Sequence, residues 1–308
     1  MYQNKNILVL GFARSGYEVA KLLSKFNNKI TINDKSPLEK HDLDKVAELK
    51  ELGINFIFGS HPEDLLDKNF DLMIKNPGIH LDNPVVENAT KKGIPITTDI
   101  EVAYNLLPEG VKIVGITGTN GKTTTTTLIY EMFKKAFGSK VYLAGNIGFP
   151  LCSLVEVLKK DDILVMEISV QQLTDTDKFN PNVLVFTNLS EAHLDLFGNS
   201  YDKYKEIKSK IFKNQTSTDV AIINHDNLEL LDMTKNIKAI KKYFSSIEKV
   251  SHCYIKNNNI YYLDENIINL DDIFLKGMHN YQNAMCAIMV AKEFNIPEDI
   301  IISELKHF

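Results

Sequence analysis

The stretch TGTNGKTTT, residues 117–125, places a lysine and a threonine directly after a glycine-rich turn. An apolar, β-branched run at 111–116 precedes it and indicates a buried strand, and glycines occupy positions 115, 118 and 121. In a strand, loop and helix of this kind, glycines let backbone N–H groups approach a phosphate. The lysine reaches the terminal phosphates, and the threonine hydroxyl can hold Mg²⁺. The pattern therefore predicts phosphate chemistry centred on Lys122 and Thr123.

A strand, turn and helix without chemistry is the competing interpretation. The common phosphate-loop pattern expects glycine at position 116, which is Ile116 here. Five consecutive threonines, Thr123 to Thr127, argue against that interpretation, because β-branched residues are poor openers of a helix selected only for stability. Phosphate binding is therefore the favoured interpretation.

Three further polar side chains lie at or after the ends of apolar segments in the same part of the chain. Glu167 lies near the end of the run 162–168, where a carboxylate suits a Mg²⁺ or water contact, as in P-loop enzymes. Asn146 lies between two glycines, where ligand binding and a left-handed turn explain it equally well. His193 follows the strand expected at 182–186 and has acidic neighbours, which favours a functional role over a structural one.

Two helical segments carry polar residues whose role the pattern leaves open. The helix predicted at 201–212 bears lysines at positions 203, 205, 208 and 210, which usually form a solvated face, and their spacing singles out none of them. His279, Asn280 and Asn283 lie at the N-cap and first turn that lead into the apolar helix expected at 284–294. Helix capping accounts for Asn280, but not for His279 and Asn283 together.

The first strand, expected at 6–10, runs into a second glycine turn, Gly11 to Gly16, and then a helix, as in dinucleotide-binding domains. The middle glycine of that motif lets the backbone approach a pyrophosphate, and here it is Ala13, so an NAD-dependent oxidoreductase is not supported. Asp34 ends the next strand, where such folds hold a ribose or a base edge. A solvated strand end explains Asp34 equally well.

Strands alternate with helices along the first third of the chain, which predicts a small, doubly wound, Rossmann-like domain at residues 1–99. A strand predicted at 70–74 ends in the turn Lys-Asn-Pro-Gly-Ile at 75–79, on the ligand-binding edge of such a sheet. Residues 100–308 are expected to form a central P-loop ATPase-type α/β domain. The fold class is therefore α/β throughout.

The composition restricts the class of partner. The net charge is −5 without a basic block, so nucleic acid is not an expected partner. No apolar run reaches the roughly 18 residues of a membrane span, and the N-terminus lacks an apolar signal core, so no membrane insertion is expected. Three scattered cysteines indicate a reducing cytoplasm without structural zinc. Arg14 is the only arginine, and hence the one candidate for bidentate recognition.

A series of motifs in a fixed order resembles the Mur ligases, the ATP-dependent amino-acid-adding enzymes of peptidoglycan synthesis. The motifs are GFARSG, KNPGI, TGTNGKTTT, GNIG, EIS followed by QL, NLSEAHLD, the lysine-bearing helix and GMHNYQN. The first two favour the D-glutamate-adding branch over its siblings and over folylpolyglutamate synthetase. The resemblance implies ligation of D-glutamate to UDP-N-acetylmuramoyl-L-alanine through an acyl phosphate, in the cytoplasm, as a step that supports cell shape and division.

The resemblance also implies four groups of site residues. The UDP substrate would be held by Gly11, Arg14, Ser15, Gly16, Asp34, Lys35, Asn76, Pro77, Gly78, Asn146 and Ser169. ATP would be bound by Gly118, Thr119, Asn120, Gly121, Lys122, Thr123, Thr124, Asn280 and Asn283. Mg²⁺ would be held by Thr123, Glu167, His193 and a carbamylated Lys208, which lies at the family's spacing after His193 (208 − 193 = 15). The catalytic residues would be Lys122, His193 and Lys208.

Two departures from the family pattern add expectations. Ala192 occupies a position where some members have aspartate, so metal binding is expected to differ slightly. The family's third domain, which carries the D-glutamate site, would begin near Phe308, so residues 1–308 alone are expected to bind nucleotides without ligating. The alternative function is accordingly a two-domain module that binds a UDP-sugar and ATP without ligase activity. The chain is expected to be a monomer.

Overall fold

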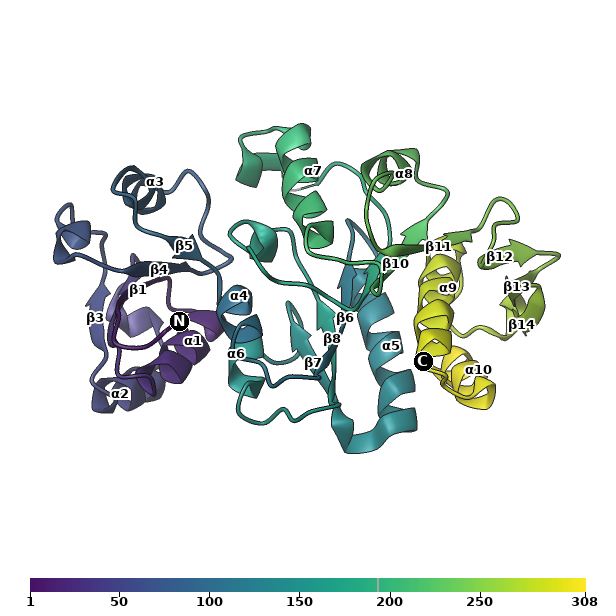
Figure 1. The fold of residues 1–308 in the computed structure, drawn as a ribbon, viewed down its shortest axis with the longest axis horizontal. Coiled ribbons are helices and arrows are strands. Elements are labelled where there is room, and N and C mark those ends of the chain that lie inside the picture. Colours follow the sequence, from purple (N-terminus) through teal and green to yellow (C-terminus); the bar gives the residue numbers. More distant parts are fainter. Residues whose placement is uncertain (193) are drawn as a thin grey trace.

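The computed structural model describes residues 1–192 and 194–308, which form two α/β units side by side (Figure 1). The N-terminal unit is a five-stranded parallel sheet with the order β3-β2-β1-β4-β5. Its strands are β1 (Asn6–Leu10), β2 (Lys29–Asp34), β3 (Asn55–Phe58), β4 (Leu72–Lys75) and β5 (Ile96–Thr97). Its helices are α1 (Arg14–Ser24), α2 (Leu43–Glu51) and α3 (Pro84–Lys91). The chain order of the strands reverses between β1 and β4, which is where such sheets bind ligands.

The central unit is built on a nine-stranded sheet with the order β14-β13-β12-β11-β10-β9-β6-β8-β7. Strands β6 to β12 pair in parallel, and β12, β13 and β14 pair in antiparallel fashion. The strands are β6 (Lys112–Thr117), β7 (Val141–Gly145), β8 (Ile163–Glu167), β9 (Val183–Phe186), β10 (Val220–Asn224), β11 (Ile240–Ser245), β12 (Cys253–Lys256), β13 (Asn259–Tyr262) and β14 (Glu265–Asn269). Because the β6 and β8 to β11 ladder is parallel, the carboxyl ends of these strands lie along one edge.

In the part of the chain that the structure describes, seven α-helices accompany the central sheet. They are α4 (Asp99–Tyr104), α5 (Lys122–Phe137), α6 (Leu151–Leu154), α7 (Tyr201–Ser209), α8 (Leu228–Met233), α9 (Met278–Glu293) and α10 (Glu298–His307). Helices α5, α9 and α10 pack together on one face of the sheet (Figure 1). None of the helices described here is long and apolar enough to cross a membrane.

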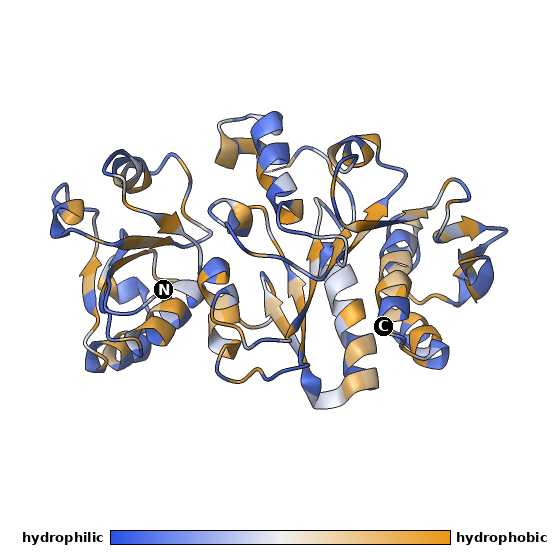
Figure 2. Cartoon of the chain, viewed as in Figure 1, coloured by the Kyte–Doolittle hydropathy of each residue, from blue (hydrophilic) through white to orange (hydrophobic). Residues whose placement is uncertain are grey.

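The hydrophobic core is continuous between the two units. One cluster of buried residues joins α1 of the N-terminal unit to α4 and α6, through side chains such as Val19, Ala20, Val102 and Leu151. A second cluster lies between the central sheet and helices α5, α9 and α10. The strands of both sheets are predominantly hydrophobic, whereas the helices carry mixed bands (Figure 2). The shared cluster fixes how the glycine turn of one unit faces the other.

The α/β fold class predicted from the sequence is confirmed, and β1 has the predicted bounds. The helix expected at 284–294 begins six residues earlier, at Met278 (284 − 278 = 6). Its first turns are polar, so the apolar pattern does not mark them as helix. Gly115 lies within β6, which continues to Thr117. A Cβ at Gly115 would lie 2.8 Å from Cδ1 of Ile168, so this glycine serves close packing.

Candidate active site between the two units

The loop between β6 and α5 has a backbone shape that depends on two glycines. Gly118 and Gly121 both have positive φ, +147° and +78°, in the region that side chains disfavour. A Cβ at Gly118 would lie 2.0 Å from Oγ1 of Thr187, and one at Gly121 would lie 2.4 Å from Oδ1 of Asn283. The segment after β9 holds the loop, because Asn188 accepts hydrogen bonds from the amides of Thr119 and Asn120, both at 2.9 Å.

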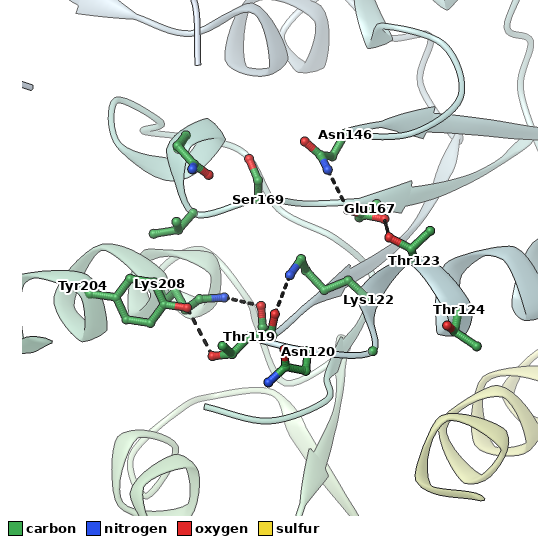
Figure 3. Close-up of a pocket in the computed structure, with 14 residues that line it drawn as sticks. Thr119, Asn120, Lys122, Thr123, Thr124, Asn146, Glu167, Ser169, Tyr204 and Lys208 are labelled. Carbon is green, nitrogen blue, oxygen red and sulfur yellow. Dashed lines mark hydrogen bonds between the residues drawn. The ribbon is translucent and has the colours of Figure 1, made fainter. Parts of the chain in front are cut away.

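A chain of polar side chains extends from this loop along the carboxyl edge of the sheet (Figure 3). Oγ1 of Thr123 donates to Glu167 at 2.7 Å, and Nδ2 of Asn146 donates to the other oxygen of Glu167, also at 2.7 Å. Nζ of Lys122 donates to the carbonyl of Thr119 at 2.8 Å. Burial lowers the pKa of Lys122, and the carboxylate of Glu167 opposes that shift. The ends of β6, β7 and β8 thus deliver an amine, a hydroxyl, an amide and a carboxylate to one place.

Lys208 lies in the same site and is buried, with 1% of its surface exposed. Its Nζ donates to the carbonyl of Gly118 at 2.7 Å and lies 5.3 Å from the ring centroids of both Phe186 and Tyr204. Burial, and secondarily the charge of Lys122, holds the pKa of Lys208 well below its ordinary value. A solvated face therefore describes the exposed Lys203 on this helix but is wrong for Lys208. A lysine with a depressed pKa spends more time as a neutral, nucleophilic amine than a solvated lysine does.

These residues surround a cavity of about 460 Å³ at the phosphate loop. Its lining contains many of the residues predicted from the sequence: Gly118, Thr119, Asn120, Gly121, Lys122, Thr123, Thr124, Asn146, Glu167, Ser169 and Lys208. Val170, Gln171 and Tyr204 also line it and were not singled out from the sequence. Tyr204 was recognisable in principle, because it lies one helical turn before Lys208 and therefore shares its face.

A second cavity, of about 300 Å³, lies beside the phosphate loop and shares Asn120 and Gly121 with the first. Asn283 lines it, and Oδ1 of Asn283 accepts a hydrogen bond from Oγ1 of Thr125 at 3.1 Å. Phe244, His279, Gln282 and Cys286 lie on its wall as well. Asn280 is not among the lining residues, and its Nδ2 donates to the carbonyl of Lys276. Of the two asparagines predicted for ATP, Asn283 faces this cavity and Asn280 supports it through a 3.3 Å hydrogen bond.

In the N-terminal unit, the turn after β1 is packed directly against the end of β4. A Cβ at Gly11 would lie 2.9 Å from Cβ of Asn76, and one at Gly16 would lie 2.3 Å from the carbonyl oxygen of Gly11. The carboxylate of Asp34 accepts hydrogen bonds from the amides of Phe12 and Ser36, at 2.7 and 2.8 Å. Burial alone would raise the pKa of Asp34, but these amides outweigh it and lower the pKa. Asp34 therefore shapes the glycine turn itself.

A third cavity, of about 230 Å³, lies between the two units and joins their sites. Its lining residues are Ala13, Arg14, Ser15, Asn76, Pro77, Asp99, Gly145, Asn146, Pro150 and Gln172. Asn146 lines both this cavity and the one at the phosphate loop. The guanidinium of Arg14 donates to the carbonyl of Gly148, across the boundary between the units. Among the other residues predicted for the UDP substrate, Lys35 and Gly78 are exposed and do not line this cavity.

His193, predicted as a metal ligand, lies outside the described residues. Within the described part of the chain, no group of three histidine, cysteine, aspartate or glutamate side chains could hold a metal ion. Thr123 and Glu167 nevertheless provide two hard oxygen donors in hydrogen-bond contact at the phosphate loop. Such a set fits Mg²⁺, which commonly takes one or two protein ligands and completes its shell with phosphates and water.

The chain belongs to the Mur ligase family. Residues 116–291 match the profile of the Mur ligase middle domain, and residues 5–98 match that of the MurD-like N-terminal domain of Mur ligases. Within the family, the chain is 41% identical over 309 residues to UDP-N-acetylmuramoylalanine--D-glutamate ligase of Bacillus cytotoxicus, with 100% of this chain and 67% of the relative covered. It is 42% identical over 308 residues to the enzyme of the same name from Geobacillus, with the same coverage. The chain thus spans about two thirds of the length of these relatives.

Solved structures of other members share the fold. One is UDP-N-acetylmuramate:L-alanyl-gamma-D-glutamyl-meso-diaminopimelate ligase from Neisseria meningitides, with a TM-score of 0.63 at 18% identity, covering 99% of this chain and 98% of that one. Another is UDP-N-acetylmuramate-alanine ligase from Thermotoga maritima, with a TM-score of 0.57 at 20% identity, covering 99% of this chain and 69% of that one. At this identity the likeness concerns the fold.

Proposed function

We propose that the protein carries out the ATP-dependent ligation of D-glutamate to UDP-N-acetylmuramoyl-L-alanine, a step of peptidoglycan synthesis. The observation that carries the proposal is the position of Asn146, which lines both the cavity at the phosphate loop and the cavity that begins at the glycine turn. A substrate with a nucleotide at one end and a carboxylate at the other can therefore span the two units. The 41% identity to ligases of this name supports the choice of substrate.

The nucleotide end of the substrate is assigned to the N-terminal unit. The turn between Gly11 and Gly16 presents backbone amides next to the N-terminus of α1, which suits a pyrophosphate. Asp34 and Lys35 would hold the uridine, and the turn Asn76 to Gly78 would line that site. Asn146 and Ser169 would face the muramoyl-alanine end, where the chain meets the phosphate loop.

The first chemical step is phosphoryl transfer from ATP. An oxygen of the substrate carboxylate attacks the γ-phosphorus, the bond from that phosphorus to the β–γ bridging oxygen breaks, and ADP leaves an acyl phosphate behind. Negative charge is concentrated on the phosphoryl oxygens, and Lys122 with the backbone amides at the N-terminus of α5 would stabilise it. The second cavity, with Asn283 on its wall, would take the adenine side of ATP.

In the second step the amine of D-glutamate attacks the acyl carbon, an amide bond forms, and inorganic phosphate leaves with one oxygen of the original carboxylate. Holding the amine in line with the acyl carbon is an orientation effect of several kcal/mol or more. Water is the competing nucleophile at this stage.

Mg²⁺ would be held by Thr123 and Glu167, with His193 and a carbamylated Lys208 as further ligands, and when bound it would neutralise phosphate charge. The low pKa of Lys208 favours the neutral amine that carbamylation by CO₂ requires. The carbamate would present an anionic oxygen ligand in place of the amine. This assignment needs a carbamate on Lys208 in the working enzyme.

We also place the step in the cytoplasm, with the enzyme as a monomer. The three cysteines are buried and unpaired, as is usual where thiols stay reduced. Light scattering after size-exclusion chromatography tests the monomer, and a stable dimer would contradict it.

A coupled assay of ADP release tests the proposed function. Release is expected to require ATP, UDP-N-acetylmuramoyl-L-alanine and D-glutamate together, and L-glutamate and D-alanine are the matched controls. The competing function, a module that binds both nucleotides without ligating, predicts binding of each in calorimetry but no ADP release that depends on D-glutamate. Such a result would overturn the proposal.

A further inference from the structure

The cavity between the two units contains two buried polar atoms that no protein group satisfies. Oδ1 of Asp99 and Nδ2 of Asn76 are both buried, and neither has a hydrogen-bond partner among the described residues. Both residues line this cavity. An unpartnered buried acceptor and donor are costly for a folded protein, so two in one cavity point to a ligand that supplies their partners.

Asp99 is the more informative of the two, because its carboxyl group is almost fully enclosed. The residue is 3% exposed at the first position of α4, and burial raises its pKa to about 6 despite the neighbouring backbone amides of Asp99 and Ile100 and the charge of Lys75. Lys75 does not pair with it: Nζ of Lys75 contacts Asp175 at 3.2 Å instead. Burial therefore outweighs the internal contacts that favour the ionised carboxylate, and the charge costs stability in the folded protein.

The neighbours of Asp99 indicate which part of the substrate passes it. Arg14 and Ser15 of the glycine turn lie on one side of the cavity, and Asn146, which reaches the phosphate loop, lies on the other. This step rests on the proposed function. The pyrophosphate of the UDP substrate then belongs to the first side and its carboxylate to the second, so the amino sugar lies between them. Its hydroxyl and acetamido N–H groups are hydrogen-bond donors, whereas phosphate oxygens would be repelled by a carboxylate.

We propose that Asp99 is a sugar-recognising residue, whose Oδ1 accepts a hydrogen bond from a donor group of the N-acetylmuramoyl ring. Asn76 donates to an acceptor of the same part of the substrate. The pair therefore distinguishes UDP carrying an amino sugar from UDP alone. Asp99 contributes binding energy for the sugar and none for the uridine or for ATP.

Calorimetry on the full chain at pH 8 tests this with two probes, UDP and UDP-N-acetylmuramoyl-L-alanine. For Asp99→Asn, the Kd of the complete substrate is expected to rise about tenfold, because a charge-assisted hydrogen bond becomes a neutral one. The Kd of UDP and that of ATP are expected to stay within about twofold. An equal weakening of UDP and of the complete substrate, or no weakening of either, would overturn the inference.

Stability separates this role from a structural one. The pKa of Asp99 is higher in the folded chain than in the unfolded chain, so its ionised form opposes folding at pH 8. Asp99→Asn should therefore raise the midpoint of thermal unfolding while it weakens sugar binding. A lowered midpoint would indicate a structural residue and contradict the inference.

Glu101→Gln is the matched control on the same helix. Glu101 is equally buried, but its carboxylate accepts hydrogen bonds from the amides of Asp177, Lys178 and Phe179, at 3.1, 2.9 and 3.0 Å. This variant should lower the unfolding midpoint and leave the ratio of the two Kd values unchanged. If the wild-type chain binds UDP but gains nothing from the amino sugar, the proposed function fails. If it gains affinity from the sugar and Asp99→Asn keeps that gain, only the present inference fails.

Discussion

Removing the carboxylate of Asp175 should destabilise the protein through a single buried amine. Lys75 is the last residue of β4 and has no exposed surface. Its Nζ contacts Asp175 at 3.2 Å and Oγ1 of Thr174 at 3.1 Å. Breaking a fully buried ion pair by removing one partner costs about 3–5 kcal/mol. The side chain of Asp175 is 21% exposed and Thr174 remains, so we expect a loss of about 2–3 kcal/mol for Asp175→Ala.

The double variant Lys75→Met, Asp175→Ala should recover much of that loss. Methionine keeps the apolar stem and removes the charge, so no buried cation is left unpaired. We expect the two substitutions to be non-additive by about 2 kcal/mol in guanidinium unfolding at pH 7.5. Asp177→Ala, which removes the exposed partner of Lys213, is the matched control and should not change stability measurably.

The pH dependence has a defined sign. Burial lowers the pKa of Lys75 below its ordinary value of 10.5, and Asp175 opposes the shift, so the Asp175→Ala variant should have a still lower pKa at Lys75. The unfolded chain then binds more protons than the folded chain between the two pKa values, and stability rises with pH there. The deficit of Asp175→Ala should shrink from pH 7.5 towards pH 9.5. An unchanged deficit, or additive effects in the double variant, would refute the reasoning.

Three further outcomes are expected. Lys122→Ala should raise the Kd of ATP at least about tenfold with little change in unfolding midpoint, and Lys134→Ala on the exposed side of α5 is the control; wild-type ATP binding by Lys122→Ala would contradict the assignment. Lys208 should carry one added CO₂ in bicarbonate, detected by ¹³C NMR, and Lys208→Ala should lose activity that a short carboxylic acid partly restores; full activity without the acid would show the lysine to be dispensable. Arg14→Lys should weaken binding of the UDP substrate, measured by calorimetry, because lysine cannot replace a guanidinium fork; unchanged affinity would remove Arg14 from that site.

The parts of the fold predictable from sequence are those in which local chemistry decides. Gly118, Gly121 and Lys122 predict the phosphate loop, and the two glycines have the positive φ values of that loop. Apolar runs gave the strands to within one or two residues, because a strand buried on both faces needs no alternation. The apolar pattern does not predict the start of α9, because its polar first turns face the second cavity and are not apolar core.

The remaining features depend on contacts between distant segments. Lys75 looked like an ordinary turn residue, and its burial arises only because Thr174 and Asp175, about a hundred positions later, close over it. The place of Asp99 likewise depends on the fold, which brings it into one cavity with Asn76 and Asn146. Periodicity and spacing in the sequence do not predict such contacts. These contacts fix the relation between the two units.

The most direct test of the central claim follows the oxygen of the substrate carboxylate. UDP-N-acetylmuramoyl-L-alanine labelled with ¹⁸O in that carboxylate is incubated with ATP, D-glutamate and the enzyme, and the inorganic phosphate is analysed by mass spectrometry. Attack of the carboxylate on the γ-phosphorus predicts one ¹⁸O atom in each phosphate released with product. Phosphate without the label, formed at a rate independent of the UDP substrate, would contradict an acyl phosphate formed at this site.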